Sequence, residues 1–449
     1  MSEWLKIKLG EIVRNGQGVL QTGPFGSQLH ASDYVDHGIP CIMPANIKGT
    51  RIDLSKISFI QESDANRLSK HITKVGDIIF SRRGDVTLKA LIRNNEEGYF
   101  CGTGCILVRP GKNVDSEFLA YYLSTDDSKN WILSKAVGAT MPNINTKILA
   151  DFPIRLPTKK EQSQIAKILS DLDSKIELNN KINAELEAMA KLIYDYWFVQ
   201  FEFPNEVGKP YKSSGGKMVW NEELKREVPE GWELGNFGTY CKSSGGYAFK
   251  SSWWSDNGLK VVKIKDIQED YTINISDLSS ASISGEKIDN KFIAKPGNIL
   301  IAMTGATVGK FGIVPITDGP LYVNQRVGFF NLGTEPIDKL PFLVNSLNQK
   351  YFREAIFTLA SGAAQPNISN EQINNIQLLI PRKTLLENYN KTLKANYNKI
   401  LLNQFQNQKL SELRDWLLPM LMNGQVKVEK LSDKEELINM AAEEREKYR

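Results

Sequence analysis

Apolar residues recur with helical spacing over two long stretches of the chain. From residue 159 to about residue 201, and again from 383 to about 423, they alternate at intervals of three and four. A heptad pattern sustained over this length predicts coiled-coil helices. Polar residues interrupt both patterns near the middle, at Asn179 and Asn183 in the first and at Gln404 and Asn407 in the second. We expect the two helices to pair antiparallel with these positions facing each other, although each helix could instead pack only on its own domain.

Ahead of each helical stretch, short apolar runs alternate with glycine-containing turns, which is typical of a mixed α/β domain. The two segments share landmarks in the same order. A strand bounded by two glycines occurs at 76–84 and again at 297–305, and Pro142-Asn143-Ile144 recurs as Pro366-Asn367-Ile368. Two copies with so long a period do not suit a solenoid. They predict two homologous domains related by a pseudo-twofold axis.

The predicted fold class is therefore α/β (α+β), with two homologous globular domains separated by an antiparallel coiled coil of two long helices. The segment after residue 203 is rich in Pro, Gly and Ser, as expected of a linker, and the end of the chain is rich in charge. The expected boundaries are 1–157 for the first domain, 158–203 for the central helix, 204–381 for the linker and second domain, 382–425 for the second long helix, and 426–449 for a charged tail.

Composition adds limits to this picture. The 449 residues are 41% hydrophobic and 24% charged, as in a globular protein of two or three domains. No signal-like start and no apolar run of about 18 residues occurs, so we expect a cytoplasmic protein. Cys41, Cys101, Cys105 and Cys241 show no paired spacing, which favours buried thiols over a zinc site or disulfides. The net charge of +4 permits nucleic-acid binding if the positive charge is localised.

Motifs that carry chemistry are absent from the sequence. Gly305-Ala306-Thr307-Val308-Gly309-Lys310 looks like a phosphate-binding loop, but it has one residue too few between its glycines, and Phe311 replaces the required Ser or Thr. No dinucleotide fingerprint occurs, and neither does the Asn-Pro-Pro-aromatic signature of adenine methyltransferases. The three histidines have no metal-ligand spacing. We expect no catalytic residues, no metal and no cofactor in this chain.

Several of these segments together resemble the specificity subunit of type I restriction-modification enzymes. They are Pro24-Phe25-Gly26-Ser27, the two glycine-bounded strands, the Pro-Asn-Ile segments, the helix entry from Gln162 to Asp173, and the aromatic run from Trp197 to Phe203. The resemblance covers roughly residues 1 to 425. The second copy departs from the first, with Ser243-Ser244-Gly245-Gly246 where the first has 22–26. That difference is expected if the two halves read different DNA.

The resemblance implies a non-catalytic subunit with two target-recognition domains, each reading one part of a bipartite asymmetric DNA site. It implies partnership with two modification subunits that carry the adenine methyltransferase and, for restriction, with two ATP-driven motor-nuclease subunits. The helices would set the gap between the half-sites, because two readers on a rigid spacer impose a fixed separation.

Residues that could read DNA are polar or basic and lie on or near the glycine-containing turns, where side chains can reach phosphates and base edges. In the first domain they are Ser27, Gln28, Lys48, Arg51, Ser81, Arg82, Arg83 and Lys89. In the second they are Ser243, Ser244, Tyr247, Lys250, Lys263, Lys265, Thr304, Lys310 and Arg326.

Two other classes of protein remain open at this point. One is a self-contained nuclease or methyltransferase, which the missing motifs disfavour. The other is a coiled-coil scaffold that binds proteins without DNA specificity.

Overall fold

The computed structural model describes residues 4–138, 140–283, 286–360 and 366–426. They form two compact units. The first unit consists of two segments of the chain, one that ends at Ser174 and one that begins at Leu410. The second unit is the segment Lys175–Lys409 between them. Each of the two long helices therefore contributes one part to each unit.

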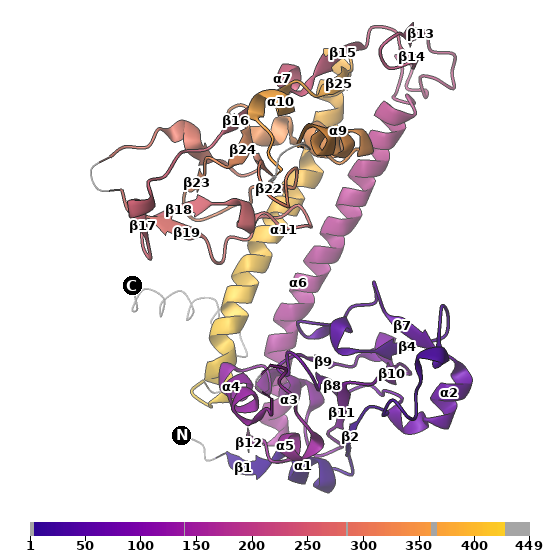
Figure 1. Ribbon diagram of the computed structural model, residues 1–449, viewed down its shortest axis with the longest axis vertical. Helices are drawn as coiled ribbons and strands as arrows, with labels where there is room; N and C mark the ends of the chain where they lie inside the picture. Colours follow the sequence, from indigo (N-terminus) through magenta and orange to yellow (C-terminus); the bar gives the residue numbers. More distant parts are fainter. Residues whose placement is uncertain (1–3, 139, 284–285, 361–365, 427–449) are drawn as a thin grey trace. The chain divides into compact units, whose positions relative to one another are not determined.

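The described part of the first unit contains two four-stranded sheets and two two-stranded ones (Figure 1). The strand orders are β2-β11-β8-β9 and β10-β4-β7-β3, and β1 pairs antiparallel with β12. All pairings in the larger sheets are antiparallel except β4 with β10. The bounds are β1 Leu5–Lys8, β2 Val19–Thr22, β3 Tyr34–Val35, β4 Ile39–Ile42, β7 Ser58–Ile60, β8 Ile78–Ser81, β9 Lys89–Leu91, β10 Phe100–Cys101, β11 Cys105–Arg109 and β12 Pro153–Leu156, with a β5–β6 hairpin at Ile47–Lys48 and Arg51–Ile52.

Alternation along strand β8 explains how the first unit forms two cores. Ile78 and Phe80 point to a core that also contains the helices, whereas Ile79 points to a second core on the other face of the sheet. All three side chains are fully buried because successive side chains of a strand leave on opposite faces. The short helices that cover this unit are α1 Leu9–Asn15, α2 Glu62–Arg67, α3 Ser116–Tyr122, α4 Asp126–Lys135 and α5 Thr146–Ala150.

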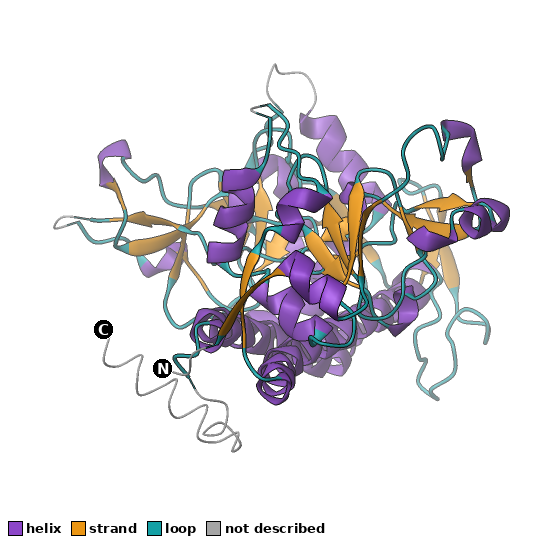
Figure 2. Cartoon of the chain, turned by 90° about the horizontal axis from the view of Figure 1, so that it is seen from below, coloured by secondary structure: helices purple, strands orange, loops and turns teal. Residues whose placement is uncertain are grey.

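The second unit repeats this topology. Its sheets have the orders β16-β24-β21-β22 and β17-β19-β18-β23-β20, β18 is parallel to β23, and β15 pairs antiparallel with β25. This match confirms the two homologous domains expected from the sequence. The strands are β13 Met218–Asn221, β14 Arg226–Pro229, β15 Glu233–Asn236, β16 Ser243–Gly245, β17 Trp254–Ser255, β18 Leu259–Val262, β19 Ser279–Ala281, β20 Ile293–Ala294, β21 Ile299–Ala302, β22 Phe311–Ile313, β23 Leu321–Val323, β24 Val327–Phe330 and β25 Gln377–Ile380; the helices are α7 Phe237–Tyr240, α8 Leu340–Leu347, α9 Lys350–Ala360 and α10 Asn370–Asn374. Figure 2 shows long loops between the short strands.

The two long helices are α6 (Lys159–Tyr194) and α11 (Lys383–Met422). Within the second unit they run antiparallel, because Asn179 bonds to Asn407 while the later Asn183 bonds to the earlier Asn403. The expected pairing of the polar interruptions is thereby confirmed for Asn407. It is wrong for Gln404, because its neighbour Asn403 is the position that is fully buried and bonds across the seam to Asn183.

Tyrosines anchor the start of α11 to α8 in the second unit. Tyr389 and Tyr397 are almost fully buried, and both hydroxyl oxygens accept a hydrogen bond from Nδ2 of Asn345, at 3.3 and 3.1 Å. A buried tyrosine needs such a partner for its hydroxyl. In the first unit Asp173 of α6 plays the matching role, accepting from the Tyr121 hydroxyl at 2.6 Å and from Arg414 of α11 at 2.7 Å. Both units therefore hold parts of both helices through buried or half-buried side chains.

Candidate DNA interface

The turns after β8 and β21 are built alike in the two units. Both follow a fully buried strand and both contain a glycine in the left-handed region, Gly84 with φ +76° and Gly305 with φ +83°. A side chain at such a position is strained, which explains the glycine. We call residues 81–84 and 302–305 the recognition turns.

The Pro-Asn-Ile segments dock on the recognition turns through the same backbone hydrogen bonds in both units. In the first, Gly84 N donates to Pro142 O at 3.1 Å and Ile144 N donates to Arg82 O at 3.0 Å. In the second, Gly305 N donates to Pro366 O and Ile368 N to Met303 O, both at 2.9 Å. The structure thus joins two sequence landmarks of each copy, the glycine-bounded strand and the Pro-Asn-Ile segment, into one junction.

Side chains differ at equivalent places on the two junctions. The first turn carries Arg82, half-buried, and Arg83, exposed, where the second carries Met303, buried, and Thr304, half-buried. Nε of Arg82 is buried without a hydrogen-bond partner in the described part of the chain. The two junctions therefore have the same backbone hydrogen bonds but carry side chains of different chemical character.

Three of the candidate DNA-reading residues prove to be buried. Ser81 is fully buried and its hydroxyl donates to Arg83 O at 2.8 Å. Ser243 is also buried, and its hydroxyl donates to Oδ1 of Asn370 at 2.6 Å, which ties β16 to α10. Lys89 is 5% exposed, and burial lowers its pKa to about 8. The expectation that these three side chains face DNA is corrected, because each is enclosed by its own domain.

The remaining candidates in the first unit lie at its surface or are half-buried. Lys48 and Arg51 are paired residues of the β5–β6 hairpin, which places two basic side chains on one short ribbon. Ser27 is exposed, and Oε1 of Gln28 accepts from Phe25 N at 3.2 Å. These four residues therefore lie in two places, the segment 25–28 and the β5–β6 hairpin.

In the second unit, aromatic and basic side chains gather beside β17. The Tyr247 and Trp253 rings stack with centroids 6.1 Å apart, and Lys250 Nζ lies 4.9 Å from the Trp253 centroid. Lys263 Nζ lies 3.3 Å from the centroid of Trp254, and burial lowers the pKa of this lysine. Trp253 and Trp254 were not among the residues expected from the sequence. Two adjacent tryptophans before a turn were the signal that could have identified them.

Four further candidates in the second unit lie in separate segments, with Ser244 in strand β16. Lys310 is ion-paired with Glu269 at 2.8 Å, and Lys265 lies 3.8 Å from Asp277. Ser244 and Arg326 are exposed. The basic side chains of this unit are thus partly neutralised by neighbouring carboxylates.

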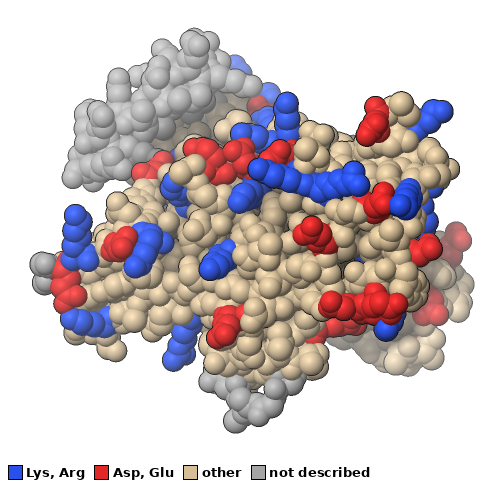
Figure 3. Space-filling view, turned by 90° about the horizontal axis from the view of Figure 1, so that it is seen from above, with Lys and Arg blue, Asp and Glu red and all other residues tan. Residues whose placement is uncertain are grey.

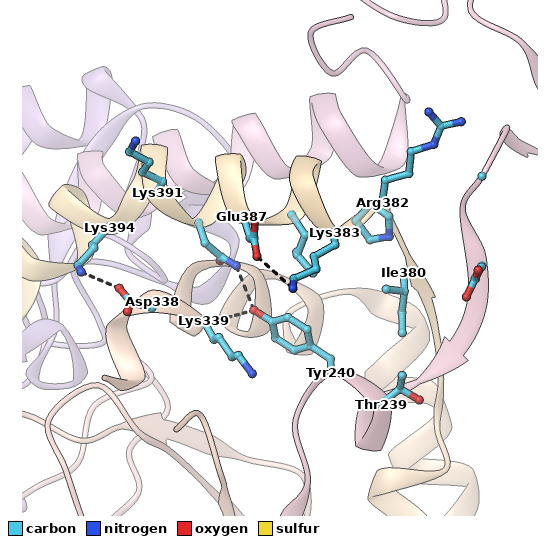
Figure 4. A pocket seen from close by; sticks show the side chains of 15 residues that line it. Thr239, Tyr240, Asp338, Lys339, Ile380, Arg382, Lys383, Glu387, Lys391 and Lys394 are labelled. Carbon is cyan, nitrogen blue, oxygen red and sulfur yellow. Dashed lines mark hydrogen bonds and ion pairs between the residues drawn. The ribbon is translucent and has the colours of Figure 1, made fainter. Parts of the chain in front are cut away.

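A cavity of about 810 Å³ lies at the start of α11 in the second unit (Figure 4). Ion pairs joining Lys394 to Asp338 and Lys383 to Glu387 lie along it, and the Tyr240 hydroxyl faces Asn390 at 3.2 Å. No recognition-turn residue lines it. We therefore do not assign the cavity to DNA reading.

The described residues contain no group of His, Cys, Asp or Glu that could hold a metal ion. The four cysteines are buried free thiols, as expected, and burial raises the pKa of Cys41 and Cys241 to about 12. A search of the helices in the described ranges finds none that is long and apolar enough to cross a membrane.

Comparison with known proteins places the chain in a family. The model of the type I restriction modification DNA specificity domain matches residues 1–188 and 229–412. The MjaIX specificity subunit of Methanocaldococcus jannaschii is 26% identical over 377 residues, which cover 83% of this chain and 82% of that protein. The HindI specificity subunit of Haemophilus influenzae is 23% identical over 481 residues, covering 95% and 100%. The crystal structure of the type I restriction-modification S subunit from M. genitalium shares the fold, with a TM-score of 0.55, 17% identity and coverage of 93% of this chain and 96% of that one. The chain belongs to the family of type I restriction-modification DNA specificity subunits.

Proposed function

We propose that this chain recognises a bipartite, asymmetric DNA site, with one domain reading each part. The observation that carries the proposal is the junction of recognition turn and Pro-Asn-Ile segment, which occurs twice with the same backbone and different side chains. A shared backbone presents both turns in the same way. Different side chains on it are what two readers of different sequences require.

The chemistry of the exposed residues suits this role. Arg83 could bind guanine O6 and N7 with two hydrogen bonds, and lysines such as Lys48 are suited to phosphates. On the face drawn in Figure 3, acidic and basic side chains are interspersed, so no continuous positive surface is present there. Binding would then depend on a few placed cations and on partner subunits. Arg51, Arg82, Lys250 and Lys263 complete the proposed basic contacts, with Ser27, Gln28, Ser244, Tyr247, Lys265, Thr304, Lys310 and Arg326 as polar or secondary ones.

We infer that the long helices act as the spacer that fixes the gap between the half-sites. Helix α6 has 36 residues and α11 has 40. At 1.5 Å per residue they are about 54 and 60 Å long, the scale of one to two turns of duplex. The boundaries of the two recognition domains proposed above, 1–157 and 204–381, leave both helices outside them.

An exposed apolar face at the end of α6 and in the π-helical turn that follows it, Asp195–Val199, supports a protein partner. Met189, Leu192, Tyr196 and Val199 follow one another at intervals of three and four and are 45%, 68%, 39% and 45% exposed. We call these four residues the apolar stripe. Contiguous exposed apolar surface marks an interaction site, and we propose that a modification subunit carrying the adenine methyltransferase docks there. The duplicated domains favour two such subunits, and two motor-nuclease subunits where the system restricts.

The test is adenine-methylation sequencing of cells that express the chain with its cognate modification subunit. We expect one bipartite methylated motif with a fixed gap. Absence of any motif, with a competent partner present, would refute the proposal. A self-contained enzyme would instead modify or cut DNA without a partner, and a pure scaffold would show no salt-sensitive binding to DNA.

A further inference from the structure

Four asparagines form a polar cluster where α6 and α11 meet in the second unit. Nδ2 of Asn179 donates to Oδ1 of Asn407 at 2.8 Å, and Nδ2 of Asn403 donates to Oδ1 of Asn183 at 2.8 Å. Asn179 and Asn403 are fully buried, and Asn183 is 7% exposed. We call these four residues the asparagine cluster. It interrupts a helix interface that is otherwise largely apolar.

The two hydrogen bonds are reciprocal. Asn179 and Asn403 are 224 residues apart, and so are Asn183 and Asn407, which is also the offset between Pro142 and Pro366. The same two positions of each repeat are therefore asparagine. In each bond the first asparagine of one helix donates to the second asparagine of the other, so the two bonds are related by a local twofold axis.

Only one antiparallel register satisfies both bonds. A slip of one helical turn, four residues, would bring Asn179 opposite Asn403 or Asn183 opposite Asn407. The other two asparagines of the cluster would then lose their amide partners. Because an unpaired buried amide is destabilising, slipped registers are disfavoured.

Stability alone does not account for the cluster. Oδ1 of Asn179 and Oδ1 of Asn403 are buried and have no hydrogen-bond partner among the residues that the structure describes. Leucines at these positions would leave no such atoms. Buried asparagine in a coiled-coil seam is the best-attested way to fix register and partner at a cost in stability.

We propose that the asparagine cluster selects a single register of α6 and α11 and thereby fixes the gap between the two DNA half-sites. The second part rests on the proposed function, since the gap matters only if both domains read DNA. A slip of four residues, at about 1.5 Å per residue, moves one helix by about 6 Å along the other. That displacement exceeds the spacing of neighbouring base pairs, about 3.4 Å, so a slipped pair would prefer a different gap. The asparagines act as positioning residues.

The register can be measured without DNA. Nitroxide labels at Glu185→Cys and Asn398→Cys, both exposed, report one interhelical distance in the full chain, and the four native cysteines are buried. We expect one narrow distance distribution in the otherwise unchanged protein. The variant N179L/N183L/N403L/N407L should show a broadened distribution or a second one that reflects a helix displacement of about 6 Å, with an unchanged or higher Tm. The control K181L/K391L, at exposed positions of the same helices, should keep the narrow distribution.

Methylation sequencing gives the functional readout. With the cognate modification subunit, the four-leucine variant should methylate sites with additional gaps, or the original site at least tenfold less. A narrow, unshifted distance together with the original gap would overturn the proposal. Should the unchanged chain give no methylated motif, the proposed function fails while the label distances still decide the register. Should the four-leucine variant not fold, N179L/N407L, which keeps the Asn183–Asn403 bond, is compared in the same way.

Discussion

Arg109 forms a bidentate ion pair with Asp77, in which Nε lies 2.7 Å from Oδ1 and Nη2 lies 2.6 Å from Oδ2. The Asp77 side chain is fully buried, and its Oδ2 also accepts from Lys74 N at 2.8 Å, which shapes the turn before β8. In the second unit Asn298 accepts from Lys295 N at 2.7 Å in the same way. One repeat therefore uses a buried ion pair where the other uses a neutral amide.

Replacing Arg109 should destabilise the first unit. Arg109→Leu leaves the Asp77 carboxylate buried and unpaired, and breaking such a pair typically costs about 3–5 kcal/mol. Urea unfolding measures the change in the free energy of unfolding. The matched variant D77N/R109L reproduces the neutral amide of the second unit and should recover most of the loss. If it is no more stable than R109L, the buried charge is not the cause.

The stability of the first unit should fall in mild acid because of His71. This side chain is 2% exposed, and neither ring nitrogen has a hydrogen-bond partner in the described ranges. Burial, with repulsion from Lys70, lowers its pKa from 6.5 to about 4. Between pH 6.5 and pH 4 the unfolded state therefore binds more protons than the folded state. The free energy of unfolding is at its full value above pH 6.5 and decreases as the pH falls toward 4. By linkage the loss between pH 7 and pH 5 is about 2 kcal/mol.

Urea unfolding at pH 7, 6 and 5 tests this pH dependence. His71→Phe should flatten it, because phenylalanine cannot be protonated. His30→Gln, at an exposed histidine of the same unit, should leave the dependence as it is. An equally steep loss in H71F would show that another group titrates.

Removing the arginines of the first recognition turn should weaken DNA binding. Each of Arg82→Ala and Arg83→Ala should cost about 1–3 kcal/mol if the side chain reads a base, or reduce the salt slope by about 1 if it contacts a phosphate. Fluorescence anisotropy at several salt concentrations separates these two cases. Arg155→Ala, an exposed arginine on β12, serves as the control. Unchanged affinity in both turn variants would remove this turn from the interface.

Introducing charge into the apolar stripe should weaken assembly. Leu192→Asp places a carboxylate on a side chain that is 68% exposed, so the fold should tolerate it while an apolar partner surface would not. We expect at least a tenfold loss of affinity for the modification subunit, measured by calorimetry, with an unchanged Tm. Ala184→Asp lies on an exposed part of the same helix away from the stripe. Equal effects of the two substitutions would exclude docking at the stripe.

The periodic parts of the fold could be predicted from the sequence. The heptads of α6 and α11 and the apolar runs of β8 and β21 each follow from one local pattern. The order of strands could not be predicted, because β2, β8 and β11 meet across long stretches of chain that no short pattern encodes. Gln404 was expected in the seam in place of Asn403 because a straight helix drifts relative to a seven-residue repeat.

The candidate site could be located but not resolved from the sequence. The glycine turns marked where side chains could reach DNA. Which side chains do so depends on burial in the folded domain, and Ser81, Lys89 and Ser243 are buried. The hydroxyl groups of Ser81 and Ser243 do form hydrogen bonds, as their residue type suggests. Their partners are groups of the protein itself, Arg83 O and Asn370 Oδ1.

Because each unit takes part of its core from both long helices, the midpoint of the chain is a poor place to recombine two such proteins. In the first unit Ile165 and Leu169 of α6 share a core with Leu417 and Leu421 of α11. In a chimera joined in the linker, α6 would come from one protein and α11 from the other, so Ile165 and Leu169 would pack against a helix from a different protein. Exchange of the segment between the two helices keeps α6 and α11 from the same protein and so preserves their packing on each other. New specificities should therefore arise more readily by exchanging the segment between two helices than by exchanging halves of the chain.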